Sequence, residues 1–388
     1  MRKLMVATRW VATAALVCTM SSIRGARAAP TDGGATAKAK LTSVPLSAPN
    51  AVLSKPDANG IQLRNDLVFS GTQLRFDSEK ATAECSLGGT KLEFSIVDAQ
   101  GFKLRYNGKA VTLQRDEMSF KPAKLRLGDD RSYVLAFPYG YVYQSQAQPG
   151  QAQQTQGMLM LRSGNGQYFS LDGQSFCLFD SNTDGYYRLS EDAIGIGKSG
   201  GAYNVFAPLG RLLSTSKGVY EITRLAEDGS ELEYTRFTGP TAKLSIAVGE
   251  TDLEIGGAFG ASDGSLNFAT PVNSTRSTEL AVVSGKYNLL YGLVYSPAMK
   301  KLVATVGPGK LSVADVSGDK ATAIKLGGPF EMEYTLQTTG RQITVASSTF
   351  HLRGKNGEEY ANFTWAAEPE ISLAVGGKTT ALGKMEFG

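Results

Sequence analysis

The sequence predicts a mainly β protein of two or three antiparallel, sandwich-like domains with few or no long helices. Glycine (44) outnumbers proline (14), and 16 tyrosines accompany 17 phenylalanines, a composition that suits strands joined by tight turns. Apolar and polar residues alternate in short runs, as they do in half-buried strands. Turn residues interrupt these runs about every 8 to 12 residues, which is typical of sandwiches.

The N-terminus predicts a secretory signal peptide over residues 1–28. Arg2 and Lys3 precede an apolar run over residues 10–20, and Ala26-Arg27-Ala28 has the small-x-small pattern that signal peptidases cleave. The run is about half of the roughly 20 residues that span a bilayer, so no transmembrane anchor is expected. We expect cleavage after Ala28 and a secreted or periplasmic protein.

The net charge offers no reason to expect a nucleic-acid partner. The formal charge of the whole chain is +4, but residues 1–28 hold five basic residues and no acid, so the remainder has 35 basic and 36 acidic residues and a charge of −1. The basicity therefore belongs to the targeting segment. The sequence leaves the partner open; an extracellular protein or a glycan is the kind of partner expected of an exported protein.

Two cysteines remain after cleavage, Cys85 and Cys177. Export would allow a disulfide between them, worth about 4 to 5 kcal/mol for so long a loop on the chain-entropy model. Both also lie in strand-like sequence, where a free cysteine packs as a small hydrophobic residue. The sequence leaves both states open.

Composition divides the mature chain into a leader and two β regions. The leader is poor in large apolar residues, so it cannot offset the entropy cost of ordering and is predicted to be flexible. A Gln-rich stretch is predicted to be a mobile surface loop. The predicted divisions are a leader over 29–60, a β domain over 61–239 with the mobile loop at 144–157, and a β-sandwich region over 240–388, with a further division near 328 left open.

Alternation is clearest at Leu92, Phe94 and Ile96 and in the next run, which ends at Asn107-Gly108. This dipeptide is a strong hairpin signal because both of its residues accept a positive φ. Further strands are expected near residues 102–106, 111–113, 132–143, 158–161, 169–179, 192–196, 203–206, 218–225, 231–237, 244–248, 253–255, 265–268, 280–283, 287–294, 302–306, 311–313, 331–336, 342–346, 350–353, 360–365 and 371–375.

Residues 180–191 carry the strongest chemical signal in the chain. Their oxygen-bearing side chains match the twelve-residue pattern D-x-[DN]-x-[DN]-G-x5-E, which supplies the oxygen ligands that Ca²⁺ prefers. The predicted ligands are the side chains of Asp180, Asn182, Asp184 and Glu191 and the carbonyl of Tyr186, with Gly185 at the turn and Arg188 at the position that often holds a water.

The segment resembles the calcium loop of the EF-hand family over these twelve residues only. It departs from that family because Tyr187 and Arg188 occupy positions 8 and 9, and because strand-like sequence flanks it in place of helices. The resemblance therefore implies a structural Ca²⁺ site in a β scaffold and not a sensor. The alternative is a turn without metal, since Asp, Asn and Gly are the residues that turns prefer.

Other motifs carry little chemistry. Residues 260–264 match G-x-S-x-G, but the only histidine, His351, lies in strand-like sequence and no helix follows. Residues 197–199 read Gly-Lys-Ser, like the end of a phosphate-binding loop, but the first glycine of that pattern would fall at Asp192. One histidine and two separated cysteines make no zinc site. No catalytic or cofactor-binding residue is predicted.

We expect a structural or binding role and not catalysis. The alternative is a carbohydrate-active protein, either a sugar-binding module or a glycosidase with two carboxylates, and Tyr139, Tyr141 and Tyr143 could stack on sugar rings or pack within the sheet. A third reading is an assembly component that pairs through exposed strand edges.

Overall fold

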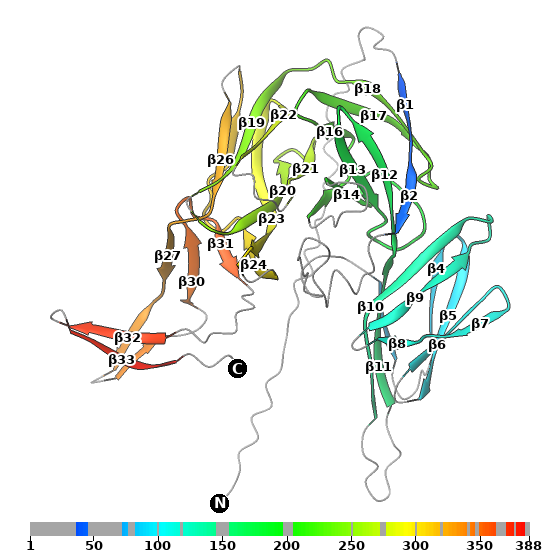
Figure 1. Cartoon of the computed structure of the whole chain (residues 1–388), viewed down its shortest axis with the longest axis horizontal. Helices are drawn as coiled ribbons and strands as arrows, with labels where there is room; N and C mark the ends of the chain where they lie inside the picture. The colour runs from blue at the N-terminus through cyan, green and yellow to red at the C-terminus, as the bar shows by residue number, and fades with distance from the viewer. Residues whose placement is uncertain are drawn as a thin grey trace, which may run out of the picture. The chain divides into compact units, whose positions relative to one another are not determined.

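Strands form the regular structure of the protein, and the mainly β fold class is confirmed (Figure 1). The computed structural model describes residues 36–45, 72–76, 82–98, 101–116, 119–144, 155–196, 205–249, 251–271, 277–298, 301–318, 321–339, 342–345, 349–361, 370–375 and 378–384. No α-helix occurs within these ranges, and almost all strand pairs are antiparallel. The predicted signal peptide lies outside the described residues. So does most of the Gln-rich stretch, whose ends belong to strands.

Two sheets enclose a first core. One sheet has the order β3-β11-β10-β9-β8 and the other β4-β5-β6-β7. Phenylalanines meet between them, since Phe94 lies edge-on to Phe137 at 6.3 Å and Phe102 to Phe120 at 5.4 Å between ring centroids. The strands are β3 (Thr72–Phe76), β4 (Thr82–Leu87), β5 (Thr90–Asp98), β6 (Gly101–Tyr106), β7 (Lys109–Thr112), β8 (Arg115–Asp116), β9 (Ser119–Arg126), β10 (Ser132–Gln144) and β11 (Thr155–Ser163).

The predicted hairpin at Asn107-Gly108 is confirmed. It joins β6 to β7, and both residues have positive φ, 46° and 72°. The alternation seen in the sequence also appears as burial, because Leu92 and Phe94 in β5 are fully buried while Lys91 is exposed. Period-2 patterning therefore identified β5 and β6 correctly, whereas β3 and β9 were not predicted.

A second core lies between the sheets β15-β14-β13-β12-β2 and β1-β18-β17-β16. Leu178, Leu209 and Leu232 are fully buried in it, together with Tyr187. The strands are β1 (Ala37–Lys40), β2 (Thr42–Pro45), β12 (Asn165–Leu171), β13 (Gln174–Phe179), β14 (Ala193–Ile196), β15 (Phe206–Pro208), β16 (Leu212–Ser214), β17 (Val219–Leu225) and β18 (Glu231–Arg236).

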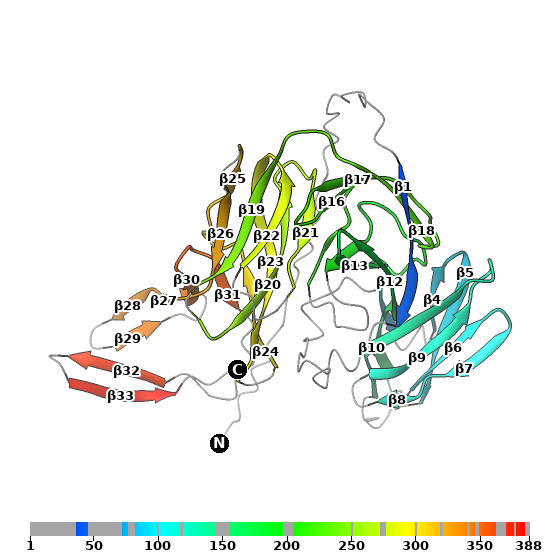
Figure 2. The same ribbon diagram turned by 45° about the horizontal axis from the view of Figure 1, so that its top comes forward.

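Two of these strands correct the leader prediction. Residues 36–45, predicted to be flexible, form β1 and β2 and pair with β18 and β12 (Figure 2). The composition argument failed here because it considers only what a segment can bury by itself. These ten residues add to sheets whose core is supplied by residues far along the chain.

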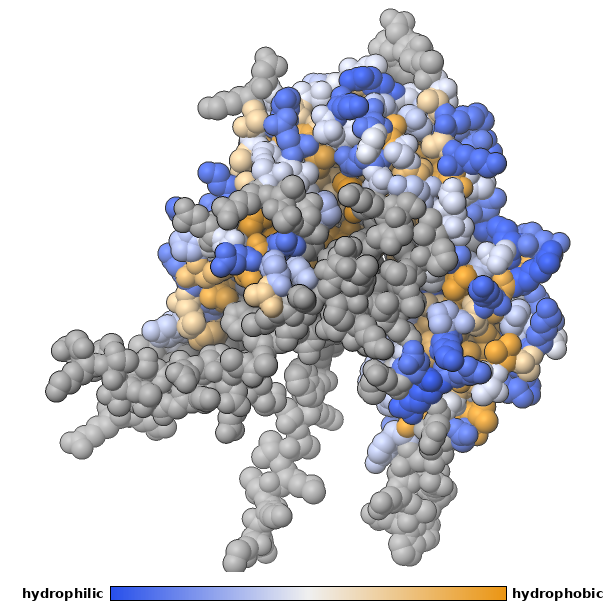
Figure 3. All heavy atoms as spheres, viewed as in Figure 1, coloured by the Kyte–Doolittle hydropathy of each residue, from blue (hydrophilic) through white to orange (hydrophobic). Residues whose placement is uncertain are grey.

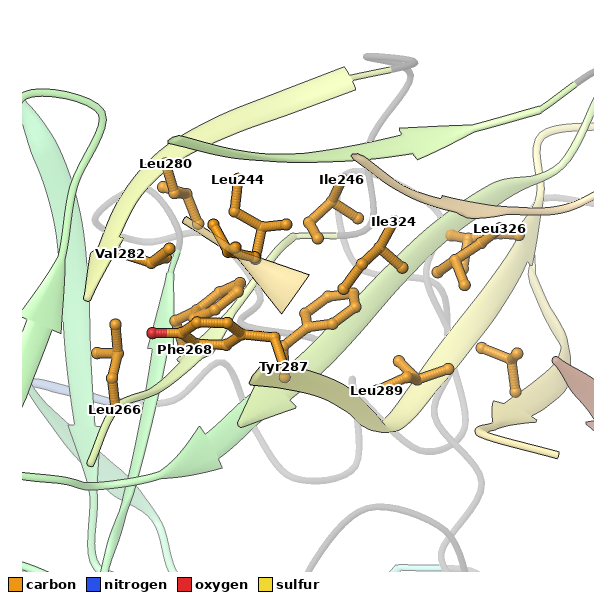
Figure 4. Packing of buried hydrophobic residues seen from close by; sticks show 14 of the residues in the cluster. Leu244, Ile246, Leu266, Phe268, Leu280, Val282, Tyr287, Leu289, Ile324 and Leu326 are labelled. Atoms are coloured by element: carbon orange, nitrogen blue, oxygen red, sulfur yellow. The ribbon is translucent and has the colours of Figure 1, made fainter. Parts of the chain in front are cut away.

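The third core is the largest (Figure 4). Residues such as Leu244, Ile324 and Tyr287 face one another between the sheet β22-β19-β26, in which β19 and β26 are parallel, and an eight-stranded sheet running from β21 to β27. The strands are β19 (Thr241–Val248), β20 (Glu254–Ala261), β21 (Asn267–Ala269), β22 (Ser277–Val283), β23 (Gly285–Ser296), β24 (Lys301–Gly307), β25 (Ala314–Val316), β26 (Thr322–Leu326), β27 (Phe330–Glu333), β30 (His351–Gly354) and β31 (Glu359–Ala361).

Two hairpins near the C-terminus form sheets of two strands each, β28 (Leu336–Thr339) with β29 (Gln342–Val345), and β32 (Glu370–Val375) with β33 (Lys378–Lys384). The predicted domain 61–239 contributes to two cores. Leu212 and Val219, which also belong to this predicted domain, pack in the third core. Residues 36–388 group into one compact unit. The domain boundaries therefore stay a prediction.

Candidate functional site

The candidate calcium loop connects β13 to β14, and its backbone is tightly folded. Three of its residues have positive φ: Thr183 at 59°, Gly185 at 85° and Ser190 at 68°. At Gly185 there is also no room for a side chain, because an added Cβ would lie 2.7 Å from the backbone nitrogen of Gly88. That nitrogen donates to the Asp184 carbonyl at 2.6 Å. The glycine at position 6 is thus required by conformation and by packing.

Asp180 is the centre of the loop. Its side chain is fully buried, and Oδ2 accepts hydrogen bonds from the backbone nitrogen of Gly185 at 2.9 Å and from the Tyr133 hydroxyl at 2.6 Å. Oδ1 accepts from the backbone nitrogen of Asp184 at 3.2 Å. One carboxylate therefore organises the loop and joins it to β10 in the first pair of sheets.

The next two oxygen-bearing residues repeat the same local device. Asn182 Oδ1 accepts from the backbone nitrogen of Asp184 at 3.0 Å, and Asp184 Oδ1 accepts from that of Tyr186 at 2.8 Å. These bonds, from a side chain to the amide two residues on, are Asx turns. The spacing of Asp180, Asn182 and Asp184 thus wraps the backbone around the side-chain oxygens.

The second half of the loop differs from the predicted ligand arrangement. Arg188 Nη1 lies 2.9 Å from Asp184 Oδ2 and 3.4 Å from Glu191 Oε2, so its guanidinium bridges two of the predicted ligands. The Glu191 side chain is half exposed. The same guanidinium lies over the Tyr186 ring, 4.6 Å from its centroid.

Sequence reasoning missed Asp192, one residue beyond the motif. Its side chain is buried, Oδ1 accepts from the backbone nitrogen of Ser181 at 3.0 Å, and Oδ2 accepts from that of Arg188 at 2.8 Å. It closes the loop by tying its start to its end. The calcium pattern stops at position 12, so it contained no signal for this residue.

Burial perturbs both inner carboxyl groups. Desolvation raises the pKa of Asp180 to about 6, although bonds from Tyr133 and Gly185 oppose the shift. Desolvation and the nearby charges of Asp180 and Asp184 raise the pKa of Asp192 to about 7. The loop therefore concentrates negative charge whose ionisation is costly without a cation nearby.

The fit to calcium is partial. Asp180 and Asn182 share the backbone nitrogen of Asp184 as a hydrogen-bond donor, whereas Glu191 contacts Arg188 and would have to leave it to join a calcium site. Within the described ranges, no group of three or more His, Cys, Asp or Glu side chains is arranged to hold a metal. The geometry suits a tight turn as it stands.

The loop also links two cores. Tyr187, at position 8, is buried in the second core, and its backbone nitrogen donates to the Glu227 carbonyl at 2.8 Å. Arg131, from the first pair of sheets, donates from Nη1 to the Gly185 carbonyl at 2.8 Å. A change in the loop would therefore alter contacts with both the first and the second core.

The hydrolase-like string at residues 260–264 forms a turn. Gly264 has φ 73°, and Asp263 Oδ1 accepts from the backbone nitrogen of Ser265 at 2.9 Å. Ser262 Oγ accepts from Asn288 at 2.9 Å, while His351 Nδ1 lies 2.7 Å from Glu359 Oε1 in another part of the fold. Nothing here resembles a nucleophile with its base. Residues 197–199 lie outside the described ranges.

A shallow cavity of about 390 Å³ lies over β24 and β31. Glu359 is the only carboxylate among the described residues that line it; the others are Tyr291, Thr305, Val306, Gly307, Pro308, Gly309 and Ala361. A glycosidase needs two carboxyl groups about 5 to 10 Å apart across its substrate. The described walls of this cavity supply one.

The alternating tyrosines of β10 face outward. Tyr141 is 39% and Tyr143 is 60% exposed, and the Tyr139 ring packs edge-on to Tyr141 at 6.0 Å. In the view of Figure 3, groups of hydrophobic residues lie among hydrophilic ones. Tyr141 and Tyr143 are thus exposed side chains of β10.

Both cysteines of the described chain, Cys85 and Cys177, are free thiols, which settles the choice left open by the sequence. Cys177 is fully buried in β13, and Cys85 is half-buried in β4.

Comparison with known proteins places the chain in no family: no family model, curated protein or solved structure matches it. None of the described segments is a helix long and apolar enough to cross a bilayer.

Proposed function

We propose that this is an exported β-rich protein with a structural or binding role, in which residues 180–191 bind Ca²⁺ and thereby stabilise the junction of two β regions. The single observation that supports this best is the side-chain pattern of the loop. Asp180 Oδ1 and Asn182 Oδ1 both accept from the backbone nitrogen of Asp184, and Asp184 Oδ1 accepts from that of Tyr186, so short oxygen-bearing side chains already shape the loop.

Electrostatics favour a cation in this loop. Asp180 is fully buried, and burial together with the charge of Asp184 raises its pKa. Burial and the charges of Asp180 and Asp184 raise the pKa of Asp192. Arg188 contacts Asp184 at the rim of the loop. A divalent ion would offset the repulsion among the three carboxylates.

Asp180, Asn182, Asp184 and the carbonyl of Tyr186 would hold the ion, and Glu191 would join them after leaving Arg188. Calcium supplies no reaction here. It would act as a ligand of the folded state, adding RT ln(1 + [L]/Kd), about 1.4 kcal/mol when free calcium is ten times Kd. Extracellular calcium sites of about 10⁻⁴ to 10⁻³ M affinity are sufficient for this role.

The test is thermal unfolding of the chain from Ala29 onward, with millimolar CaCl₂ or with EDTA. Calcium should raise the melting temperature, and Asp180→Ala should abolish the difference. Asp263→Ala is the matched control, because it removes an Asx turn of the same kind outside the loop and should leave the calcium response intact. Equal melting of the unmodified protein in both solutions would show that the loop is a turn without metal.

Carbohydrate binding is the second candidate, supported by the exposure of Tyr141 and Tyr143 on one face of β10. Aromatic rings displayed in this way offer an apolar surface with a polar edge. Affinity electrophoresis through gels containing soluble polysaccharides would test it. A retarded protein that loses retardation in Tyr143→Ala would support binding, and unchanged mobility in every gel would exclude it.

A further inference from the structure

β1 and β2, the first two strands of the described residues, each add to the edge of a different sheet whose other strands come from later in the chain. β1 lies at the edge of one sheet, next to β18, and β2 lies at the edge of the other, next to β12 (Figures 1 and 2). The partners are far away in sequence: Lys38 and Glu231 are 193 positions apart, and Ser43 and Asn165 are 122 apart.

The segment is held mainly at its surface. Leu41 is its one buried side chain among those described, and Ala39 is half-buried. The deepest residues of the second core, Leu178, Leu209 and Leu232, come from other strands. Releasing residues 36–45 would therefore uncover two strand edges and one leucine site, and would leave most of the core packed.

Ion pairs and hydrogen bonds accompany the backbone pairing of this segment. Lys38 Nζ lies 2.9 Å from Glu233 and 3.2 Å from Glu231, two acids that alternate along β18. The Leu41 backbone nitrogen donates to the Ser230 carbonyl at 2.9 Å, and Asn165 Nδ2 donates to Ser43 Oγ at 3.0 Å. A basic strand is thus matched to an acidic edge.

The connection to the rest of the chain does not confine the segment to its own sheets. Residues 46–71 separate β2 from β3, and a stretch of that length reaches roughly 85 Å when extended. Every contact just described would form identically between two copies. Whether the segment pairs within its own molecule or with a second copy then depends on the protein concentration, relative to the effective concentration set by the connection.

We propose that residues 36–45 are an exchangeable strand pair, and that the edges of β18 and β12 accept this segment from a second copy of the chain. Reciprocal exchange closes a dimer, and one-way exchange extends an open chain of copies. The proposal goes beyond the function proposed above and does not depend on calcium binding at residues 180–191.

The test uses two variants of the chain from Ala29 onward, each in a Cys85→Ser background. One carries Lys38→Cys and the other Glu233→Cys, two positions that are Cα partners in the register of β1 and β18. Directly opposed residues of an antiparallel pair lie about 4.5 to 5.5 Å apart, within the range that a disulfide spans. The two proteins are unfolded in urea, mixed, refolded together and oxidised, and the 38–233 linkage is identified by peptide mass mapping.

Exchange predicts a mixed dimer joined at 38–233, in a yield that rises with protein concentration. The matched control replaces Lys38→Cys by Lys40→Cys, which lies opposite Glu231 and is out of register by two positions. Its diagonal separation of about 7 to 8 Å exceeds the reach of a relaxed disulfide, so its yield should be at least tenfold lower.

A chain carrying both Lys38→Cys and Glu233→Cys provides the internal reference and should link within one molecule. If this variant links internally while the mixture gives no 38–233 dimer above the Lys40→Cys control, the segment does not exchange and the proposal is wrong. It is equally wrong if the double variant forms no 38–233 linkage, since the register itself then fails. Neither result bears on the calcium melting test, so the two proposals fail separately.

Discussion

Replacing Gly185 by alanine should destabilise the protein much more than the same change at another left-handed glycine. Gly185 has φ 85°, a conformation that costs an alanine about 1 to 2 kcal/mol. In addition, the new Cβ would lie 2.7 Å from the Gly88 nitrogen and 3.1 Å from its Cα, so backbone must move. The hydrogen bond from Gly88 to Asp184 would stretch, at a further cost of about 1 to 2 kcal/mol. The free energy of unfolding should fall by about 2 to 4 kcal/mol.

Gly108 provides the matched control. It has φ 72°, but nothing lies within 4 Å of an added Cβ. Gly108→Ala should therefore show the conformational cost alone, about 1 to 2 kcal/mol. Urea unfolding followed by circular dichroism, in EDTA, measures both variants. Equal losses at the two positions would refute the argument that the loop is pressed against the turn at Gly88.

Three further predictions follow from side-chain environments. Tyr133→Phe should lower the free energy of unfolding by about 1 to 3 kcal/mol, because it removes a 2.6 Å bond to a buried carboxylate, whereas Tyr106→Phe, with a 3.5 Å bond, should change it little in the same urea titration. Burial raises the pKa of the Cys85 thiol to about 11 and that of Cys177 further, so iodoacetamide at pH 8 should label Cys177 only in urea. Because both cysteines are free thiols, dithiothreitol should not shift the melting temperature. In EDTA, the free energy of unfolding should decline as pH rises from 5 to 8. The folded-state pKa of Asp192, about 7, exceeds its ordinary value, so the folded protein binds this proton more tightly than the unfolded chain and loses that advantage as the proton leaves. Asp192→Asn should flatten the pH dependence of the melting temperature, and an unchanged slope would contradict the role given to Asp192.

Strands such as β5 and β6 were predictable because the pattern of their burial is local in origin. Alternation at Leu92 and Phe94 reflects a sheet with one face on a core, and the Asn107-Gly108 signal reflects the φ values that a two-residue hairpin needs. The sequence pattern and the three-dimensional arrangement have the same cause here. Such signals survive without knowledge of any partner strand.

Predictions failed where the partner is distant or the apolar run is short. Residues 311–313, predicted as a strand, lie between a turn at Gly309 and β25 and form no strand, because three residues are too few for alternation to be distinctive. The prediction that residues 37–40 are flexible was wrong because the partner of β1 is distant in sequence. This strand is held by backbone pairing with β18, almost 200 positions away, and no local window contains that information.

The candidate site shows the same division within twelve residues. Asp180, Asn182 and Asp184 were identified because both a calcium loop and a series of Asx turns require short oxygen-bearing side chains at every second position. Their hydrogen bonds show that these side chains shape the loop first, since each holds a backbone amide.

The groups that decide the rest are long-range or unpatterned. Tyr133 reaches Asp180 from β10, and Asp192 closes the loop from outside the motif. Arg188 bridges the two carboxylates that a cation would need, Asp184 and Glu191. Under the proposal above, a calcium ion would therefore compete with this guanidinium for the same carboxylate oxygens. Arg188→Gln removes the competitor and retains a polar side chain, so it should increase the calcium-dependent rise in melting temperature if the ion binds as proposed.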